Sequence, residues 1–337
     1  MGDVHGDLTA LVRALALAKL IAPLTTTTSL GEIRWIGEDS LLVQVGDVLD
    51  RGSEECSCFF LLALLSRQAK EVGGGVVLLL GNHEILNVLG LFNYAEKGGN
   101  EEFEKVFGEA INKMEGTEKW RINYAGNQPA RWRAMEPGGM LSFTYPFLSN
   151  FVLSVQVGSS VFVHGGITPN HLKTHGTLTE MNNAARSWLS TSAIDPFPTP
   201  PTTKDEIIAR AQSRANTIEK TMPSFLGGGT QKEPSPIWSR VYSSPNDRPP
   251  SNTKFADSQA SEALAKIGNE AKRFVVGHTP QDNINSALDG KVWRIDVAMS
   301  KGMGGGNIQV LEIIEGGRGG GEDRITILGK EEINSNE

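Results

Sequence analysis

Short apolar runs that stop at a glycine and are followed by polar residues recur along this sequence. The most regular is Leu41–Val45, which is mostly branched and shows no helical spacing, so it predicts a buried strand. Gly46 follows, then Asp47, Asp50 and Arg51, and glycine at this point allows the backbone to turn sharply. Because the functional groups of open α/β sheets lie beyond the carboxyl ends of strands, we expect these charged side chains to line a crevice.

Four more loops combine an apolar run, a nearby glycine, and Asp, Asn or His; only the one at the N-terminus lacks its run. They are Gly81–Glu84 after Val76–Leu80, His164–Gly166 after Val161–Val163, Gly277–Pro280 after Phe274–Val276, and Gly2–Asp7 at the start of the chain. Four of the six histidines of the chain lie in these loops. The sequence therefore predicts one shared site at one edge of one sheet.

Helical spacing of apolar residues appears between these runs. Leu8–Ile21 carries an apolar stripe, and Ser53–Lys70 has glutamates in its first turn, where acidic groups suit the helix dipole. Glu32–Trp35 has the character of a strand, and Phe151–Val157 predicts a hairpin with the run that ends at Val163. Alternating strands and helices form βαβ units, so we expect an α/β fold with right-handed crossovers.

Residues 92–145 interrupt this alternation. They contain a charged helical segment, Glu101–Lys119, among several Trp, Tyr and Phe residues. This insertion either flanks the crevice and shapes substrate access, or is only a packed structural excursion. Later stretches rich in Pro, Thr, Ser and Gly predict surface loops around a helix at 205–221: residues 191–205, 223–236 and 243–253.

Composition limits the class of protein. With 337 residues, of which 39% are hydrophobic and 21% charged, the chain has enough apolar material for a large core. A net charge of −7 and a pI of about 5.5 disfavour a nucleic-acid-binding surface. No apolar run approaches the ~20 residues of a membrane span. Cys56 and Cys58 fit reduced thiols on a helix better than a redox or metal pair, so we expect a soluble intracellular protein.

The first polar loop lacks the strand that precedes the other four. Such a strand would cover a sheet edge and keep Asp3 away from a fraying terminus. We therefore expect that the sequence is truncated at its N-terminus, and that any targeting segment is missing with the leading strand.

Two other patterns do not predict a ligand site. The glycine triplets at 227–229, 304–306 and 319–321 lack the Lys-Ser/Thr of a phosphate-binding P-loop and predict flexible turns. His171 and His175, four residues apart, fit a solvent-facing helix better than a metal pair.

The residue types in the five polar loops indicate a metal centre. Carboxylate, amide oxygen and imidazole suit divalent ions such as Mn²⁺, Fe or Zn²⁺, and the lack of cysteine ligands disfavours a structural zinc site. Six ligand side chains exceed the need of one catalytic ion, so we expect two ions ~3.5–4 Å apart that share one carboxylate. Such a pair lowers the pKa of a bound water and yields a hydroxide that attacks phosphorus in line. Asp50 and Arg51 would add an acidic partner and a guanidinium for phosphate oxygens.

The order of these motifs resembles the phosphoprotein phosphatase branch of the calcineurin-like metallophosphoesterases. The matching segments span residues 1 to about 300: Gly2–Gly6, Gly46–Gly52, Gly81–Glu84, His164–Gly166 and Gly277–His278. Within that branch, the Gly-Asp-Val-Leu-Asp-Arg-Gly form of the second motif, the aromatic insertion and Ile295–Val297 resemble the Shewanella-like protein phosphatases of plants, algae and some protists.

The resemblance implies a fold and a domain layout. The expected fold is the α/β calcineurin-like metallophosphoesterase fold, with two packed β-sheets flanked by helices. It would occupy residues 1–315, with the helical and aromatic insertion at about 92–145, and a Gly-rich and polar tail would follow at 316–337. The resemblance leaves the cytoplasm and the plastid as the expected compartments.

The resemblance also assigns the site residues. It places six side chains on two metal ions: Asp3, His5 and Asp47 on one, and Asp47, Asn82, His164 and His278 on the other. It gives four residues catalytic roles: His83 as the general acid that protonates the leaving alcohol, Asp50 as its hydrogen-bond partner, and Arg51 and Arg240 as phosphate clamps. Mn²⁺ is the expected metal, with Fe or Zn²⁺ as alternatives, and Glu84 is expected to be structural.

The residues themselves support the role of His83. It directly follows a ligand in the sequence, so it does not easily reach the same ion. A carboxylate beside it, such as that of Asp50, would favour the protonated imidazole that an acid requires.

The implied reaction is one-step hydrolysis of phosphomonoesters, with Ser/Thr phosphoproteins or peptides as the expected substrates. Bis(5′-nucleosyl) tetraphosphates and phosphotyrosine proteins are alternatives, because pocket walls rather than metal ligands decide the substrate. A catalytically silent binding module with the same fold is a further alternative. We expect no nucleic-acid or membrane partner, and the sequence leaves any regulatory subunit undetermined.

Two segments depart from the family pattern. Asp296–Ser300 stands where toxin-sensitive eukaryotic phosphatases carry a Tyr-containing loop, so their toxin site and regulatory-subunit grooves are not expected here. The Gly-rich residues 301–321 have no family role.

Overall fold

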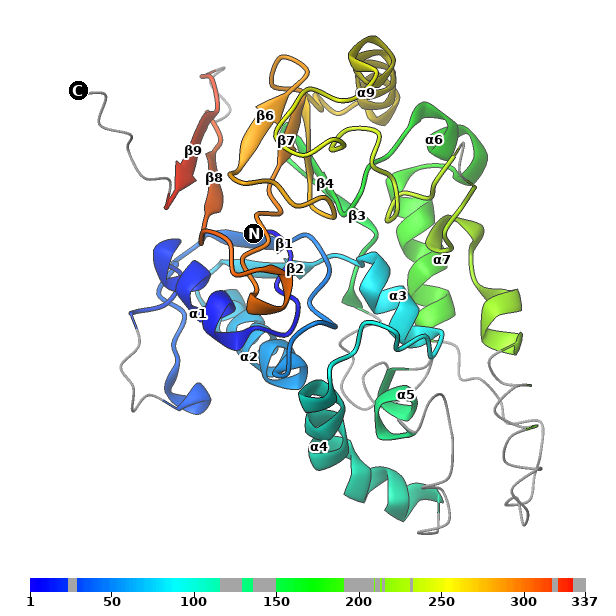
Figure 1. The fold of residues 1–337 in the computed structure, drawn as a ribbon. Helices are drawn as coiled ribbons and strands as arrows, with labels where there is room; N and C mark the ends of the chain where they lie inside the picture. Colours follow the sequence, from blue (N-terminus) through cyan, green and yellow to red (C-terminus); the bar gives the residue numbers. More distant parts are fainter. Residues whose placement is uncertain are drawn as a thin grey trace.

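The computed structural model arranges the strands in three hydrogen-bonded groups, with the helices outside them (Figure 1). It describes nine parts of the chain: residues 1–23, 29–115, 129–135, 150–190, 209, 213, 216–230, 233–316 and 321–329. The loop predicted at 191–205 lies entirely outside these residues, as does part of the helix predicted at 205–221.

Strands β1 (Leu41–Gln44) and β2 (Gly75–Leu78) form the first group. They run parallel, and helix α2 (Glu55–Glu71) connects them. The predicted βαβ unit is therefore present, with boundaries close to those expected. After β2, Leu79 forms a single parallel bridge with Val152. Val152 lies just before β3 (Ser154–Val157).

The first residues of the chain lie along β1. The amino group of Met1 donates to the carbonyl of Val43 (2.9 Å), and the N–H of Val45 donates to the carbonyl of Met1 (3.1 Å). This pairing brings the first polar loop, residues 2–7, to the same edge as the loop that follows β1.

The second group is a five-stranded sheet in the order β3 (Ser154–Val157), β4 (Ser160–Val163), β5 (Arg273–Val276), β7 (Val292–Arg294) and β6 (Asn285–Ala287). The hairpin of β3 and β4 is the one predicted. β4, β5 and β7 run parallel, and β6 is antiparallel to β7. The two ligand runs at β4 and β5 are therefore neighbours, and their carboxyl ends meet at one edge.

Helices α6 (Pro169–His175), α7 (Leu178–Ser190) and α9 (Thr253–Ile267) cover this sheet: α9 packs on β5 and on α6, and α7 packs on β3.

The expectation that His171 faces solvent is wrong. Its ring is buried, accepts from the N–H of Thr168 (3.1 Å) and lies 3.0 Å from the carbonyl of Pro234. A later loop covers this side of α6, and the helical spacing alone does not reveal that cover.

Helix α1 (Leu8–Leu17) packs against α2. It begins where the side chain of Asp7 accepts from the N–H of Ala10 (2.9 Å), and it ends before the predicted Ile21. The two cysteines on α2 are free and buried in the core, and burial raises the pKa of both thiols. They are inert packing residues at neutral pH.

In the described part of the insertion, residues 92–115 and 129–135, helices α4 (Lys97–Glu115) and α5 (Pro129–Met135) pack against each other. Helix α3 (Asn82–Val88) precedes them and contacts α5. Figure 1 shows α4 and α5 on the side of the molecule away from β8 and β9. The buried rings of Phe103 and Phe107 attach α4 to the core.

Strands β8 (Val310–Ile314) and β9 (Arg324–Leu328) form the third group, an antiparallel hairpin. β9 lies in the stretch predicted as a Gly-rich and polar tail, residues 316–337; its alternation of Ile and Thr is a strand pattern. The predicted strand Glu32–Trp35 is instead a 3-10 turn at Leu30–Glu32, followed by a single bridge residue, Trp35. Short 3-10 turns also occur at Ser224–Leu226 and Lys301–Met303.

Among the described residues, none of the helices has both the length and the apolar character needed to cross a membrane.

Candidate metal centre

The polar loop after β1 is built by unusual backbone conformations. Gly46 has φ of 100°, and a Cβ there would lie 2.6 Å from the backbone nitrogen of Gly81. Asp47, Asp50 and Arg51 follow with φ values of 56°, 67° and 63°. Residues other than glycine seldom adopt this region of backbone conformation. Together these conformations turn three charged side chains inward within five residues.

Glu84 holds this loop in place. Its buried carboxylate accepts from the backbone N–H groups of Asp47 (2.8 Å), Val48 (2.9 Å) and Leu49 (3.2 Å), and from that of Gly81 (2.8 Å). One side chain therefore fixes the loop after β1 to the start of α3. This arrangement agrees with the prediction that Glu84 is structural.

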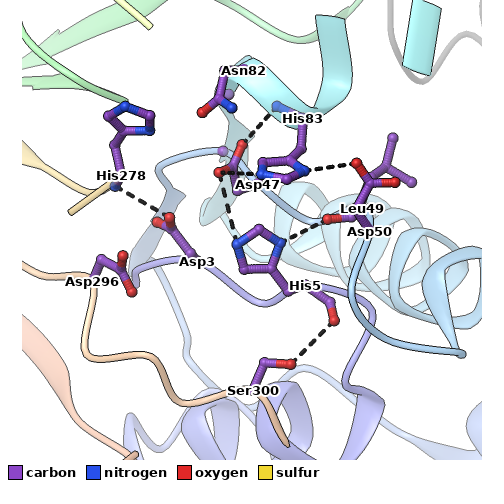
Figure 2. Close-up of polar contacts among 12 residues, drawn as sticks. Asp3, His5, Asp47, Leu49, Asp50, Asn82, His83, His278, Asp296 and Ser300 are labelled. Atoms are coloured by element: carbon purple, nitrogen blue, oxygen red, sulfur yellow. Dashed lines mark hydrogen bonds and ion pairs between the residues drawn. The ribbon is translucent and has the colours of Figure 1, made fainter. Parts of the chain in front are cut away.

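The carboxylate of Asp47 lies among three imidazoles, and Figure 2 shows two of them, those of His5 and His83. Its Oδ2 is 3.2 Å from Nε2 of His164, 3.8 Å from Nε2 of His5 and 3.9 Å from Nε2 of His83. Its Oδ1 accepts from the backbone N–H of His83 (3.0 Å). A single buried aspartate thus connects side chains from three of the five polar loops.

Backbone carbonyls orient two of these imidazoles. Nδ1 of His5 lies 2.8 Å from the carbonyl of Leu49, and Nδ1 of His164 lies 2.8 Å from the carbonyl of Val45. Because a carbonyl only accepts, each Nδ1 carries a proton, and Nε2 is the nitrogen left to face the site. Metal-binding histidines are held in this way.

Burial also favours the metal-binding form of two histidines. It lowers the pKa of His5 to about 4, despite the opposing charge of Asp47, and it lowers the pKa of His278, where His164 adds to the effect. Both imidazoles are therefore neutral at pH 7, and a neutral imidazole is the form that binds a metal.

Several acceptor atoms converge where a cation would satisfy them. Asn82 Oδ1 lies 3.0 Å from Nε2 of His164. Asp3 Oδ1 and His278 Nε2 are buried, and neither has a hydrogen-bond partner within the described parts of the chain. The pKa of Asp3 is raised by burial and by the charges of Asp296 and Asp47, so its ionised form needs a positive charge nearby. These observations fit divalent metal binding.

The described residues contain two groups of three side chains that could bind a metal ion, and within each group the donor atoms lie within 4.8 Å of one another. The first group is His5, Asp47 and His83, and the second is Asp47, His164 and His278. Asp47 belongs to both groups, as expected for a shared ligand of two ions. The second group agrees with the sequence assignment, whereas the first contains His83 where that assignment has Asp3. Asp3 lies beside the cluster, where its Oδ2 accepts from the N–H of His278 (3.1 Å; Figure 2).

A second contact distinguishes His83 from the other imidazoles. Its Nδ1 lies 2.7 Å from Oδ2 of Asp50, a carboxylate that is fully buried. Burial lowers the pKa of His83, but the charge of Asp47 and the hydrogen bond to Asp50 outweigh it, and the net shift is upward. The upward shift and the hydrogen bond to Asp50 both favour the protonated ring that a general acid requires, and His83 lines the cavity.

A cavity of about 110 Å³ opens over this cluster. Both predicted arginines line it. The Nε of Arg51 is buried and has no hydrogen-bond partner in the described residues, and its guanidinium lies 4.8 Å from the ring centre of Tyr94. Arg240 donates to the hydroxyl of Thr279 (2.9 Å). The structure therefore brings together the residues that the sequence predicts; Asp50 and His164 lie behind the lining.

Sequence reasoning missed three residues at the site. Asp296 lines the cavity, and burial with the charge of Asp47 raises its pKa to about 6. It follows β7 just as the other acidic residues follow their strands, so the same pattern identifies it. Tyr94 and Trp238 also line the cavity; they come from irregular segments and have no comparable sequence signal.

The sequence matches the family described as Calcineurin-like phosphoesterase over residues 1–298. The chain therefore belongs to this family of metal-dependent phosphoester hydrolases, which use a dinuclear divalent metal centre, and the predicted α/β fold and family are confirmed.

Its relatives include Shewanella-like phosphatases. It is 32% identical to Shewanella-like protein phosphatase 2 from Arabidopsis thaliana over 335 residues, which cover 93% of this chain and 74% of the relative. It is 27% identical to Shewanella-like protein phosphatase 1 from Plasmodium berghei, over 89% of this chain and 66% of that one. The fold is similar to that of a cold-active protein-tyrosine phosphatase from a psychrophilic Shewanella, with a TM-score of 0.56 and 20% identity, covering 92% of this chain and 75% of that chain.

Proposed function

We propose that this protein removes the phosphoryl group from phosphoserine and phosphothreonine residues of proteins or peptides. The observation that carries the proposal is the content of one cavity: His83, Arg51 and Arg240 face the same space as the Asp47 cluster. Two guanidinium groups can bind the phosphate oxygens of a monoester, an imidazole can protonate its leaving group, and the residues below them are of the types that bind metal ions. Both named relatives are called protein phosphatases.

The residues of the chain divide the work. We propose that Asp3, His5, Asp47, Asn82, His164 and His278 hold two divalent ions. When bound, such ions act as Lewis acids and activate water for attack on phosphorus. Arg51 and Arg240 bind the phosphate oxygens and orient the ester. His83 gives its Nε2 proton to the leaving oxygen as the phosphorus–oxygen bond breaks, and Asp50 orients the ring from behind.

Mn²⁺ is our first choice of metal, with Fe and Zn²⁺ as alternatives. The donor set contains carboxylate, amide and imidazole groups and lacks thiolates, and such a set accepts several divalent ions. Elemental analysis of purified protein, followed by reloading with each ion, identifies the metal that supports turnover.

Phosphotyrosine is the second candidate substrate. Tyr94, Trp238 and Met303 line the cavity and offer surfaces against which an aromatic ester could pack. A structure with the same fold is named a protein-tyrosine phosphatase, although at 20% identity it shows the fold alone.

A substrate panel tests these proposals. The metal-loaded protein is assayed on phosphoserine, phosphothreonine and phosphotyrosine peptides of the same sequence and on a bis(5′-nucleosyl) tetraphosphate. We expect the first two peptides to be hydrolysed fastest. Preference for the phosphotyrosine peptide would move the assignment to the second candidate, and cleavage of the dinucleotide alone would refute a protein phosphatase. No turnover with two ions bound would indicate a silent binding module.

Two variants separate catalysis from metal binding. His83→Asn should lower kcat on the phosphoserine peptide by ~10²–10⁴ and leave the metal content unchanged, because it removes only the acid. Asp47→Asn should lose both metal and activity. If His83→Asn loses metal as Asp47→Asn does, His83 is a ligand in the group that it shares with His5, and its role as an acid is wrong.

A further inference from the structure

Arg131 is the largest of the fully buried side chains in the described residues. It lies on α5, in the inserted helical region. Its Nε donates to Oδ1 of Asn87 (2.6 Å), its two terminal nitrogens donate to the two oxygens of Glu55 (both 2.6 Å), and Nη2 also donates to Oδ1 of Asp50 (2.8 Å). An arginine so completely bonded has a fixed position.

Aromatic rings enclose the same guanidinium. Its central carbon lies 4.7 Å from the ring centre of Phe103 and 5.5 Å from that of Phe92. Both rings belong to the inserted region or the segment that leads into it, so Arg131 is held by its own region and reaches out to α2 and α3.

Asp50 stands between this arginine and the active site. One oxygen, Oδ2, holds Nδ1 of His83 at 2.7 Å, and the other, Oδ1, accepts from Arg131 and from Nδ2 of Asn87 (3.0 Å). Its backbone N–H donates to Glu55. Both carboxylate oxygens and the backbone N–H of Asp50 are therefore hydrogen-bonded, which keeps its side chain from rotating away from His83. Arg131 also bonds directly to Asn87 and Glu55, the other partners of Asp50.

Two buried carboxylates share the guanidinium of Arg131. It pairs with Asp50 (2.8 Å) and with Glu55 (2.6 Å). Without Arg131, these two carboxylates would lose the cation between them in a space closed to water. Their repulsion would push Asp50 away from the position in which it holds His83.

We propose that Arg131 is a positioning residue for the general acid, and that through it the inserted region completes the active site. This inference rests on the proposed function. Arg131 is not among the residues that line the cavity; it acts by fixing Asp50, which orients the ring of His83.

Leaving groups of different basicity reveal such a role. An alkyl phosphate such as phosphoserine releases an alkoxide, which needs the proton of His83 as the bond breaks. A nitrophenyl phosphate releases a stable phenolate and needs that proton little. Misplacing His83 should therefore slow the first reaction more than the second, whereas general loss of structure or of metal should slow both alike.

The test compares Arg131→Ala with wild type on a phosphoserine peptide and on p-nitrophenyl phosphate, each with metal content measured. We expect kcat to fall roughly 10–100-fold on the peptide, a part of the ~10²–10⁴ that a general acid supplies, and less than about threefold on the nitrophenyl ester. Guanidinium ion added to the variant should restore part of the peptide activity. Arg273→Ala is the matched control: it removes another paired arginine, whose partner is Asp323 and not Asp50 or Glu55, and should leave the ratio of the two rates unchanged.

A double variant keeps the test valid if Arg131→Ala fails to fold. Arg131→Met with Glu55→Gln removes one positive and one negative charge, so the net charge of the buried cluster does not change. It should show the same selective loss on the peptide. An equal loss on both substrates, or no loss on either, overturns the proposal.

An NMR measurement is independent of activity. The proton on Nδ1 of His83, in its 2.7 Å hydrogen bond to Asp50, should give a downfield resonance in the whole protein, and the double variant should lose or shift it. An unchanged resonance overturns the role of Arg131. If the metal-loaded wild type hydrolyses neither substrate, the proposed function fails, and this resonance alone decides whether Arg131 holds the pair.

Discussion

At the scale of single residues, the site depends on a strained loop and on the carboxylate of Glu84, which holds the first part of that loop. Asp47, Asp50 and Arg51 each adopt a positive φ, and such conformations persist only when the surroundings impose them, at a cost of about 1–3 kcal/mol each. Glu84 supplies the constraint by accepting four backbone N–H groups. It works without touching substrate, and it decides where Asp47 points.

Glu84→Gln should therefore destabilise the protein more than an ordinary surface change. The amide keeps one acceptor oxygen but replaces the other with an N–H donor that faces backbone N–H groups. We expect a loss of about 2–3 kcal/mol in the free energy of unfolding, together with weaker metal binding. Urea denaturation measures the first effect and metal titration the second. Glu104→Gln, an exposed change on α4, is the control; similar stabilities for the two variants would refute this role of Glu84.

At the scale of elements, polar contacts join the β8–β9 hairpin to the β3–β4 turn and to β5. Asp323, just before β9, accepts from the guanidinium of Arg273 (2.7 Å) and from the hydroxyl of Ser159 (2.6 Å). These hydrogen bonds lower the pKa of Asp323 to about 2, below the ordinary 3.8. A carboxyl whose pKa is lower in the folded state stabilises that state above its unfolded pKa.

The contribution of Asp323 is thus complete above about pH 4 and is lost as the pH falls toward 2. For an ion pair near the surface we expect ~1 kcal/mol or less. Hydrogen exchange of the β9 amides at pH 3 and pH 6 should show the hairpin opening more readily in acid, beyond the intrinsic change in exchange rate. Asp323→Asn should remove most of this difference. An identical pH response in that variant would assign the effect to another group.

The elements also show what local sequence patterns can predict. β1, α2 and β2 lie close to their expected boundaries. A long apolar run or a long helical stripe is compatible with only one type of secondary structure, so the sequence predicts it well. The strand expected at Glu32–Trp35 is wrong, since four residues are too few to distinguish a strand from a turn. β9 was overlooked because glycines and charged residues surround a short alternating run.

At the scale of the whole molecule, the site is assembled from segments as far apart as Asp3 and His278, which are joined by a hydrogen bond across 275 positions. Most of these loops can be recognised from local sequence, as an apolar run followed by glycine and a polar residue. Their common position at one edge can be predicted because the carboxyl ends of parallel strands meet there. Arg131 carries no such pattern. It meets Asp50 across 81 positions and out of an insertion, so only the three-dimensional structure reveals that contact.

This assembly makes metal binding a property of the entire fold. The proposed ligands come from the N-terminal loop, from the loops after β1 and β2, and from the loops after β4 and β5, so ions that bind only the folded chain should stabilise all of it at once. At free metal 100 times the dissociation constant, the expected gain is ~2.7 kcal/mol, or roughly 5 °C in Tm. Scanning calorimetry with Mn²⁺ and then with excess chelator measures it. Asp47→Asn should abolish the shift, whereas Arg273→Ala should keep it. A shift of equal size in Asp47→Asn would place the stabilising ions elsewhere and remove the central support for a shared carboxylate.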